Sequence, residues 1–186
     1  GTHLTLKLMD YHLVVYKVDK LSRVFGMIFA LITFIGCLFA FHVKEAAKQT
    51  AALLYSAGAL GVTFAGDFIT LFVFWELMSL PSPYLIWARG TRESEKAGMR
   101  YLMFHIFGGG LLFAGILAHT GETGGILIEQ LTARHSLSSW LILAGVALNA
   151  AVVPLHAWLS DAYPKATVTG AVFLSALTTK TAVYVL

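Results

Sequence analysis

The chain has 186 residues, of which 58% are hydrophobic and only 12% are charged, and its formal net charge is +3. Soluble globular domains are usually about 45–50% apolar and about 25% charged, so this composition excludes an ordinary soluble domain. The basic residues lie at the ends of apolar runs and form no basic patch, which argues against a nucleic-acid partner. Cys37, the single cysteine, lies inside an apolar run and predicts a small buried hydrophobe without a disulfide framework.

The apolar runs predict an all-α fold, a polytopic transmembrane helix bundle. A helix needs about 20 mostly apolar residues to cross a hydrocarbon core of about 30 Å, and several windows meet this requirement. The runs are continuous rather than alternating, which favours helices over a barrel. We expect residues 1–23 to be an extramembrane or interfacial segment and residues 24–186 to form the bundle. The six expected spans are Val24–His42, Thr50–Gly66, Phe68–Ala88, Ala97–His119, Ser138–Val153 and Ala166–Leu186.

Several residues predict turns and breaks between these spans. Gly66 and Asp67 predict a tight turn with Asp67 as a helix N-cap. Pro154 predicts that the fifth helix ends or breaks nearby, followed by a connection over Leu155–Lys165. The sequence starts at Gly1 and stops inside an apolar run, so we expect it to be part of a longer polytopic protein.

The distribution of basic residues predicts an orientation in the cell (inner) membrane. If all six spans cross, one side carries the larger basic set and is expected to be cytoplasmic. That set is Lys44, Lys48, Arg89, Arg92, Lys96, Arg100 and Lys165, and the opposite set is Lys17, Lys20, Arg23 and Arg134.

Four polar side chains lie well inside the predicted spans, at roughly 12–21 Å along their helices. They are Glu76, His105, Asn149 and Lys180. A charge at such a depth costs several kcal/mol, faces the bundle interior or a wet cavity, and often marks an ion path. His156 follows Pro154 at a helix break, and broken helices line cavities in transporters. We therefore expect a proton path through Glu76, Lys180, His156, Asn149 and His105.

Structural interpretations stay open for each of these residues. Glu76 would then belong to a structural ion pair, Lys180 would extend to the interface, His105 would be a satisfied interior histidine, and Asn149 would hold helices together by hydrogen bonds. No Walker loop, GxGxxG or CxxC motif occurs, so we expect no catalytic residue, cofactor or metal site within the chain.

Three stretches resemble a known family, the proton-translocating antiporter-like membrane subunits. This family includes the long membrane subunits of respiratory complex I, related hydrogenase subunits, and the A and D subunits of Mrp-type sodium/proton antiporters. Residues 66–86 (GDFITLFVFWELMSLPSPYLI) resemble its glutamate helix, and residues 174–184 (LSALTTKTAVY) resemble its lysine helix. Residues 153–162 (VPLHAWLSDA) resemble its Pro-Leu-His-x-Trp-Leu-Pro-Asp-Ala signature.

The resemblance implies a fold of about 14 helices with two inverted five-helix repeats, each containing a broken helix, of which this chain would hold the first repeat. It also implies that Glu76 is the key carboxylate, that Lys180 leads towards the central hydrophilic axis, and that His156 lies on the connecting link. The segment Leu77-Met-Ser-Leu-Pro-Ser82 resembles the D-type antiporter and hydrogenase branch.

Two residues depart from the family pattern. Asn149 stands where the family usually has a lysine that pairs with the glutamate, and Ser160 replaces the second proline of the signature. Asn149 cannot carry the charge that would tune Glu76. Glu76 would then couple to Lys180 through water, or this chain would not pump by the usual route.

These observations favour a membrane subunit that conducts protons, or exchanges cations for protons, within a multi-subunit complex. The expected partners are other membrane subunits, protons or monovalent cations, and the lipid bilayer. One alternative is a membrane subunit of an NADH:quinone oxidoreductase or membrane-bound hydrogenase complex that couples redox chemistry on a partner to proton translocation. Another is a structural membrane subunit with a degenerate ion path. On each interpretation the chain is not catalytic alone.

Overall fold

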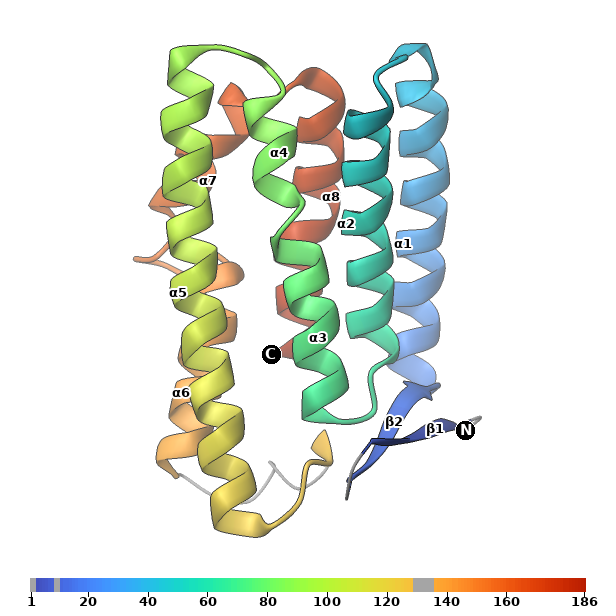
Figure 1. Cartoon of the computed structure of the whole chain (residues 1–186), viewed down its shortest axis with the longest axis vertical. Helices are drawn as coiled ribbons and strands as arrows, with labels where there is room; N and C mark the ends of the chain where they lie inside the picture. The colour runs from blue at the N-terminus through green and yellow to red at the C-terminus, as the bar shows by residue number, and fades with distance from the viewer. Residues whose placement is uncertain (1–2, 9–10, 129–135) are drawn as a thin grey trace.

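The computed structural model describes residues 3–8, 11–128 and 136–186, which form a bundle of upright helices with a β-hairpin at one end (Figure 1). The hairpin and the first three helical segments are β1 (His3–Leu8), β2 (Tyr11–Lys17), α1 (Lys20–Phe39), η1 (Ala40–His42) and α2 (Ala46–Phe64). The middle of the chain forms α3 (Phe68–Ser79), α4 (Ser82–Trp87) and α5 (Arg92–Thr123). The last elements are α6 (Leu137–Asn149), α7 (Ala157–Ala162), η3 (Tyr163–Lys165) and α8 (Val168–Val185).

The N-terminal segment, expected to be extramembrane or interfacial, contains the antiparallel pair β1–β2, which was not predicted from the sequence. The side chain of Asp19 accepts a hydrogen bond from the Ser22 backbone N–H and forms a capping box, so α1 begins at Lys20. The first helix therefore begins four residues before the predicted Val24. The division of the chain at residue 23 stays a prediction.

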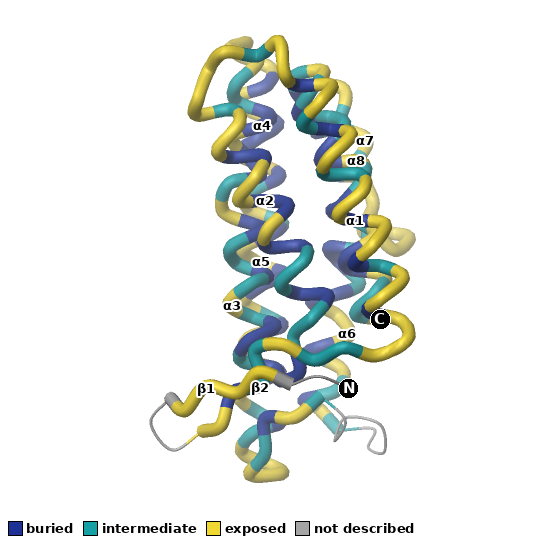
Figure 2. Tube along the Cα trace, turned by 90° about the vertical axis from the view of Figure 1, so that its right-hand side faces the viewer, coloured by how far each residue is buried: buried dark blue, intermediate teal, exposed yellow. Residues whose placement is uncertain are grey.

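The predicted all-α membrane fold is confirmed, and each of the six expected ranges is largely helical. In the described residues, four stretches are long and apolar enough to cross a membrane by length and composition: Lys20–His42, Phe68–Trp87, Arg92–Thr123 and Val168–Val185. The other two expected spans correspond to α2, which packs against α1, α3 and α8, and to α6, which is apolar but has only 13 residues. One face of α1 is exposed and apolar, as a lipid-facing helix requires (Figure 2).

The third expected span is two helices, because the chain breaks between α3 and α4 at Leu80 and Pro81. Proline has no backbone N–H to donate, so within a helix it is tolerated only near the start, and Pro81 occupies the position directly before α4. The break leaves the last turn of α3 in the middle of the bundle.

The fifth expected span ends earlier than predicted, at Asn149 rather than near Val153. Ala151 has φ of 56°, and this left-handed conformation cannot continue a right-handed helix. The predicted connection Leu155–Lys165 is also partly helical, because it contains α7 and η3. The indole Nε1–H of Trp158 donates to the Leu148 carbonyl oxygen over 3.0 Å, so a hydrogen bond joins α7 to the last turn of α6.

Asp67 caps α3, as predicted, and also joins α3 to β2. Its carboxylate accepts hydrogen bonds from the Thr70 backbone N–H at 2.8 Å and from the Thr70 hydroxyl at 2.7 Å. It also accepts from the Val14 N–H of β2 at 2.7 Å. The side chain is fully buried, so these donors lie where water cannot replace Asp67.

The buried apolar residues form two separate clusters along the bundle axis. The first, which we call the α4-end cluster, includes Tyr55, Met78, Tyr101, Trp158 and Leu177. The second, the hairpin-end cluster, includes Val62, Trp75, Leu112, Val146 and Ala182. Five elements or element pairs therefore pass from one cluster to the other: α2, α3, α5, α6 with α7, and α8.

The basic set expected on one side gathers at a single end of the bundle. Its members lie between η1 and α2, between α4 and α5, in the first turn of α2, in the first three turns of α5, and in η3. These parts of the chain meet at the α4 end (Figure 1). The opposite set has Lys17, Lys20 and Arg23 near the hairpin, whereas Arg134 lies outside the described residues. The cytoplasmic assignment of the α4 end stays a prediction.

We predict that Asp67→Ala destabilises the chain by about 2–4 kcal/mol, because it removes a cap and leaves buried donors unpaired. Thermal unfolding in detergent and limited proteolysis within residues 11–17 measure the effect. Asp19→Ala, which removes the exposed cap of α1, should cost only about 1 kcal/mol. Equal losses in the two variants, with no faster cleavage of the hairpin in Asp67→Ala, would contradict the anchoring role.

Candidate functional site

Glu76 lies in the last turn of α3, between Trp75 of the hairpin-end cluster and Met78 of the α4-end cluster. Its side chain is half-buried, and no hydrogen bond or ion pair holds its carboxyl group among residues 3–8, 11–128 and 136–186. One carboxyl oxygen faces the backbone of Gly109 on α5, since a Cβ at Gly109 would collide with Glu76 Oε1. The carboxyl group therefore lies inside the bundle against a helix that has no side chain at that point.

Asn149 packs against the same segment of α5. Its side-chain oxygen is 3.3 Å from the position that a Cβ on Gly108 would occupy. The residue is 1% exposed, and both its amide oxygen and its amide nitrogen are buried without a hydrogen-bond partner. Asn149 and Glu76 thus end against adjacent residues of α5, whose Cα atoms are about 3.8 Å apart.

Close packing of α5 and α6 places Asn149 there. A Cβ on Gly145 would lie 2.6 Å from the Gly108 carbonyl oxygen and 2.7 Å from the Leu112 nitrogen, so only glycine allows the two backbones to approach this closely. Asn149 follows Gly145 by one helical turn and so faces the same side of α5.

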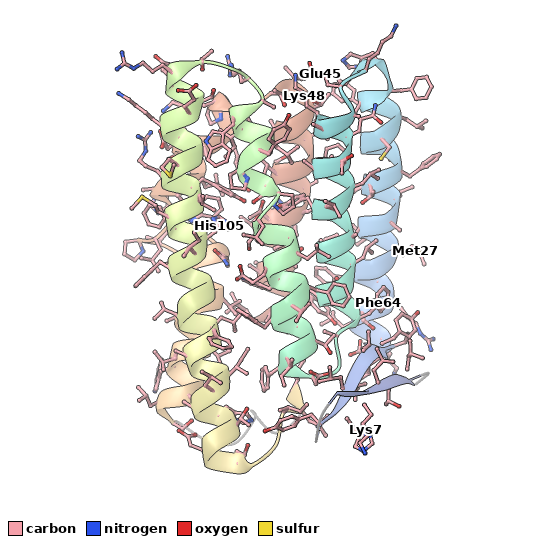
Figure 3. All side chains as sticks on the ribbon, viewed as in Figure 1. Lys7, Met27, Glu45, Lys48, Phe64 and His105 are labelled. Carbon is pink, nitrogen blue, oxygen red and sulfur yellow. The ribbon has the colours of Figure 1, made fainter. Side chains whose placement is uncertain are left out.

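His105 precedes Gly108 and Gly109 by about one turn of α5 and shares their buried face. Its ring stacks on Tyr101 with centroids 3.9 Å apart and meets the edge of Trp158 at 4.8 Å. The Nδ1 atom lies 2.9 Å from the Tyr101 carbonyl oxygen, whereas Nε2 is buried without a partner. The labelled side chain lies on the inner side of α5 (Figure 3).

These residues belong to a layer between the two apolar clusters, which we call the polar seam and define as Glu76, His105, Asn149 and Thr181. Glu76, His105 and Thr181 lie between members of the two clusters along their own helices. Asn149 ends α6 between Val146 of the hairpin-end cluster and Trp158 of the α4-end cluster. Thr181 of α8 is fully buried, and its hydroxyl has no partner. The seam therefore contains a carboxyl group and several polar atoms that no described residue satisfies, and such atoms are expected to bind water or ions.

Two predicted path residues lie away from the seam. Lys180 is on the exposed side of α8, where its Nζ donates to the Ser175 carbonyl oxygen at 2.6 Å. His156 is exposed at the start of α7, next to the exposed segment 152–155. The structure therefore brings together Glu76, Asn149 and His105. Among the described residues, no hydrogen bond or ion pair connects these three to Lys180 or His156.

Sequence reasoning missed Thr181, although the periodicity of α8 carries a signal for it. The buried positions Phe173, Leu174, Leu177, Thr178 and Thr181 recur at helical spacing. That stripe places Thr181 inside the bundle and Lys180 outside it. Ser79, one turn after Glu76, is a second buried hydroxyl without a partner that the sequence did not single out.

A charged cluster lies at the α4 end, where Asp161 and Lys165 are outside the predicted membrane spans and Arg100 is near the start of the fourth span. Asp161 of α7 makes ion pairs with Arg100, at 2.6 Å, and with Lys165. Burial alone would raise the pKa of the Asp161 carboxyl, but the hydrogen bonds and charges of Lys165 and Arg100 hold it below its usual value of 3.8. Asp161 thus links α5, α7 and η3 by charge at the end of the bundle.

The chain matches a model of the family described as NADH:quinone oxidoreductase/Mrp antiporter, TM, over residues 65–186. NADH-quinone oxidoreductase subunit N of Deinococcus radiodurans is 30% identical over 141 residues, covering 69% of this chain and 29% of that protein. The A-type Na(+)/H(+) antiporter subunit of Alkalihalophilus pseudofirmus is 30% identical over 186 residues, covering 90% of this chain and 23% of that protein. The chain thus spans less than a third of the length of these relatives.

Solved structures give the same fold. A chain of the Mrp complex from a Dietzia species superposes with a TM-score of 0.81 at 32% identity, covering 90% of this chain and 34% of that one. A chain of an archaeal respiratory complex, the membrane-bound sulfane sulfur reductase, superposes with a TM-score of 0.87 at 25% identity, covering 99% and 31%. The relatives above are of the N and A types, so the expected D-type branch stays a prediction.

We predict that Gly145→Ala destabilises the chain by about 1–3 kcal/mol, because the added methyl group pushes α6 away from α5. Gly110→Ala is the matched control, since a Cβ there meets nothing within 4 Å. This control should be neutral or stabilising by up to about 1 kcal/mol, the usual gain from replacing glycine inside a helix. Thermal unfolding in detergent measures both, and a Gly145→Ala protein as stable as wild type would contradict the close approach.

We predict that Asp161→Asn lowers stability at neutral pH by less than about 1 kcal/mol, the usual limit for exposed ion pairs. Because the folded-state pKa of Asp161 lies below 3.8, its contribution is complete above that pH and is lost as the pH falls through the folded-state value. Thermal midpoints of wild type and variant should therefore converge below pH 3.8. A difference that stayed constant down to acid pH would show that the charge of Asp161 is not the cause.

Proposed function

The chain belongs to the family of NADH:quinone oxidoreductase and Mrp antiporter transmembrane subunits, and on that premise we propose that it conducts protons, or exchanges cations for protons, as one membrane subunit of a larger complex. Its site is the polar seam, with Glu76 as the ion-binding group. Its location is the cell membrane, in keeping with the family and with the four apolar helices.

The observation that carries the proposal is the unpaired carboxyl group of Glu76 between two apolar clusters. An ionised carboxylate in such a place is costly unless a positive charge accompanies it. No described residue supplies a fixed positive charge, because Asn149 offers only a neutral amide and Lys180 points away. The countercharge is therefore mobile, and a proton or a monovalent cation fills that role.

The rest of the complex has a place to bind. Lys180, His156 and segment 152–155 are each exposed in this chain, although charged groups inside a membrane normally face protein or water. We propose that further helices of the full-length protein, or other membrane subunits, cover these residues. Lys180 and His156 would then continue the path from the polar seam towards that neighbour.

A related function differs in its driving reaction. The relatives in Deinococcus radiodurans and Pseudomonas aeruginosa are named NADH-quinone oxidoreductase subunits N and M. In that form of the proposal, redox chemistry on a partner drives proton movement through the same polar seam. A structural subunit with a degenerate path differs from both, because it would carry no ion flux.

We predict that Glu76→Gln reduces proton flux at least 10-fold, to the background of empty vesicles, because glutamine cannot exchange a proton. Flux is measured with a pH-sensitive dye after a pH step in vesicles that contain the full complex. Glu93→Gln, at the exposed start of α5, is the matched control and should stay within about 2-fold of wild type. Normal flux through the Glu76→Gln complex would reject the proposed function.

A further inference from the structure

We propose that His105 is the second proton-binding group of the polar seam and exchanges a proton with Glu76, taking the part that a fixed ammonium at position 149 would otherwise play. The inference rests on the proposed function. It assigns the partner of Glu76 to a neighbour on α5 rather than to Lys180.

The hydrogen bond of the His105 ring determines which nitrogen can react. A carbonyl oxygen only accepts, so the contact with Tyr101 makes Nδ1 the donor and places a hydrogen on that nitrogen. In the neutral ring Nε2 then carries a free lone pair. That lone pair is buried and has no partner among the described residues, so it is a base without a bound proton or donor.

The position of the ring places this base on the seam. His105 lies about one turn before Gly108 and Gly109 on one buried face of α5. The side chain of Asn149 ends against Gly108, and that of Glu76 ends against Gly109. Tyr101 and Trp158 hold two sides of the ring, so His105 cannot swing out of the bundle without unpacking Trp158 from the end of α6. The unpaired amide of Asn149 is suited to bind a water molecule beside the two groups.

The transfer conserves charge and atoms. The O–H bond of the protonated Glu76 carboxyl breaks, an N–H bond forms at His105 Nε2, and a carboxylate and an imidazolium result. An intervening water can relay the proton by accepting one hydrogen and giving up another. The product is an ion pair inside the seam, so neither charge is left alone at membrane depth.

The test is a double-mutant cycle in vesicles that contain the full complex. In the wild-type background, His105→Gln should reduce proton flux at least 10-fold. Asn149→Lys places a longer, charged side chain beside Glu76. Because this ammonium group would replace His105 as the partner of Glu76, the Asn149→Lys protein should conduct protons even without His105. Adding His105→Gln to the Asn149→Lys protein should then change flux by less than about 2-fold.

His119→Gln is the matched control. His119 is on the same helix, is 3% exposed and also has an unpaired Nε2, but it packs edge-on against Phe68 of the hairpin-end cluster, away from the seam. Its replacement should leave flux within about 2-fold of wild type. Thermal unfolding of every variant in detergent shows whether the fold is retained.

Each other outcome overturns the inference. A His105→Gln effect of equal size in both backgrounds would show a packing role, and an inactive Asn149→Lys protein would show that a fixed ammonium cannot replace the histidine. Normal flux in His105→Gln, with none in Glu76→Gln, would reject the proton-binding role of His105 but not the proposed function. Normal flux in Glu76→Gln would reject the proposed function as well.

Discussion

A carboxyl group between two apolar clusters, with no fixed positive charge beside it, is the constraint on which the rest of the structure depends. The α4-end and hairpin-end clusters place apolar side chains on both sides of the half-buried Glu76, so solvent can disperse the charge of the carboxylate only in part. The glycines of α5 make room for the group, and the break between α3 and α4 leaves it at the end of a helix in mid-bundle. These features favour a group whose charge changes as an ion arrives and leaves.

The break between α6 and α7 positions residues of the polar seam as well. The left-handed Ala151, two residues after Asn149, prevents α6 from continuing. Trp158 then donates to a carbonyl oxygen of α6 and packs against the ring of His105. Broken helices at membrane depth occur where protein or water can satisfy the freed backbone groups. The seam is therefore built by the two chain breaks together with the close α5–α6 packing at Gly145, and each depends on residues distant in sequence.

Much of this was predictable from the sequence, because apolar runs, prolines and motifs are local signals. The helical ranges, the N-cap at Asp67, the importance of Glu76 and the family were all read from such signals, and the fold class and the family are confirmed. The hairpin and the early end of α6 were missed, since the left-handed conformation of Ala151 has no marker in its residue type. The meeting of Glu76, Asn149 and His105 could not be predicted either, because it depends on how α3, α5 and α6 pack. The outward position of Lys180 did have a signal in the periodicity of α8.

The central claim is that Glu76 gains and loses a proton while the assembled complex transports ions. Infrared difference spectroscopy of the full complex during a pH step measures this most directly, with Glu76→Gln and ¹³C labelling of glutamate to assign the bands. The account predicts a carboxylic acid C=O band that changes in the wild-type complex and is absent from the difference spectrum of the variant. Identical difference spectra for the two proteins would contradict it.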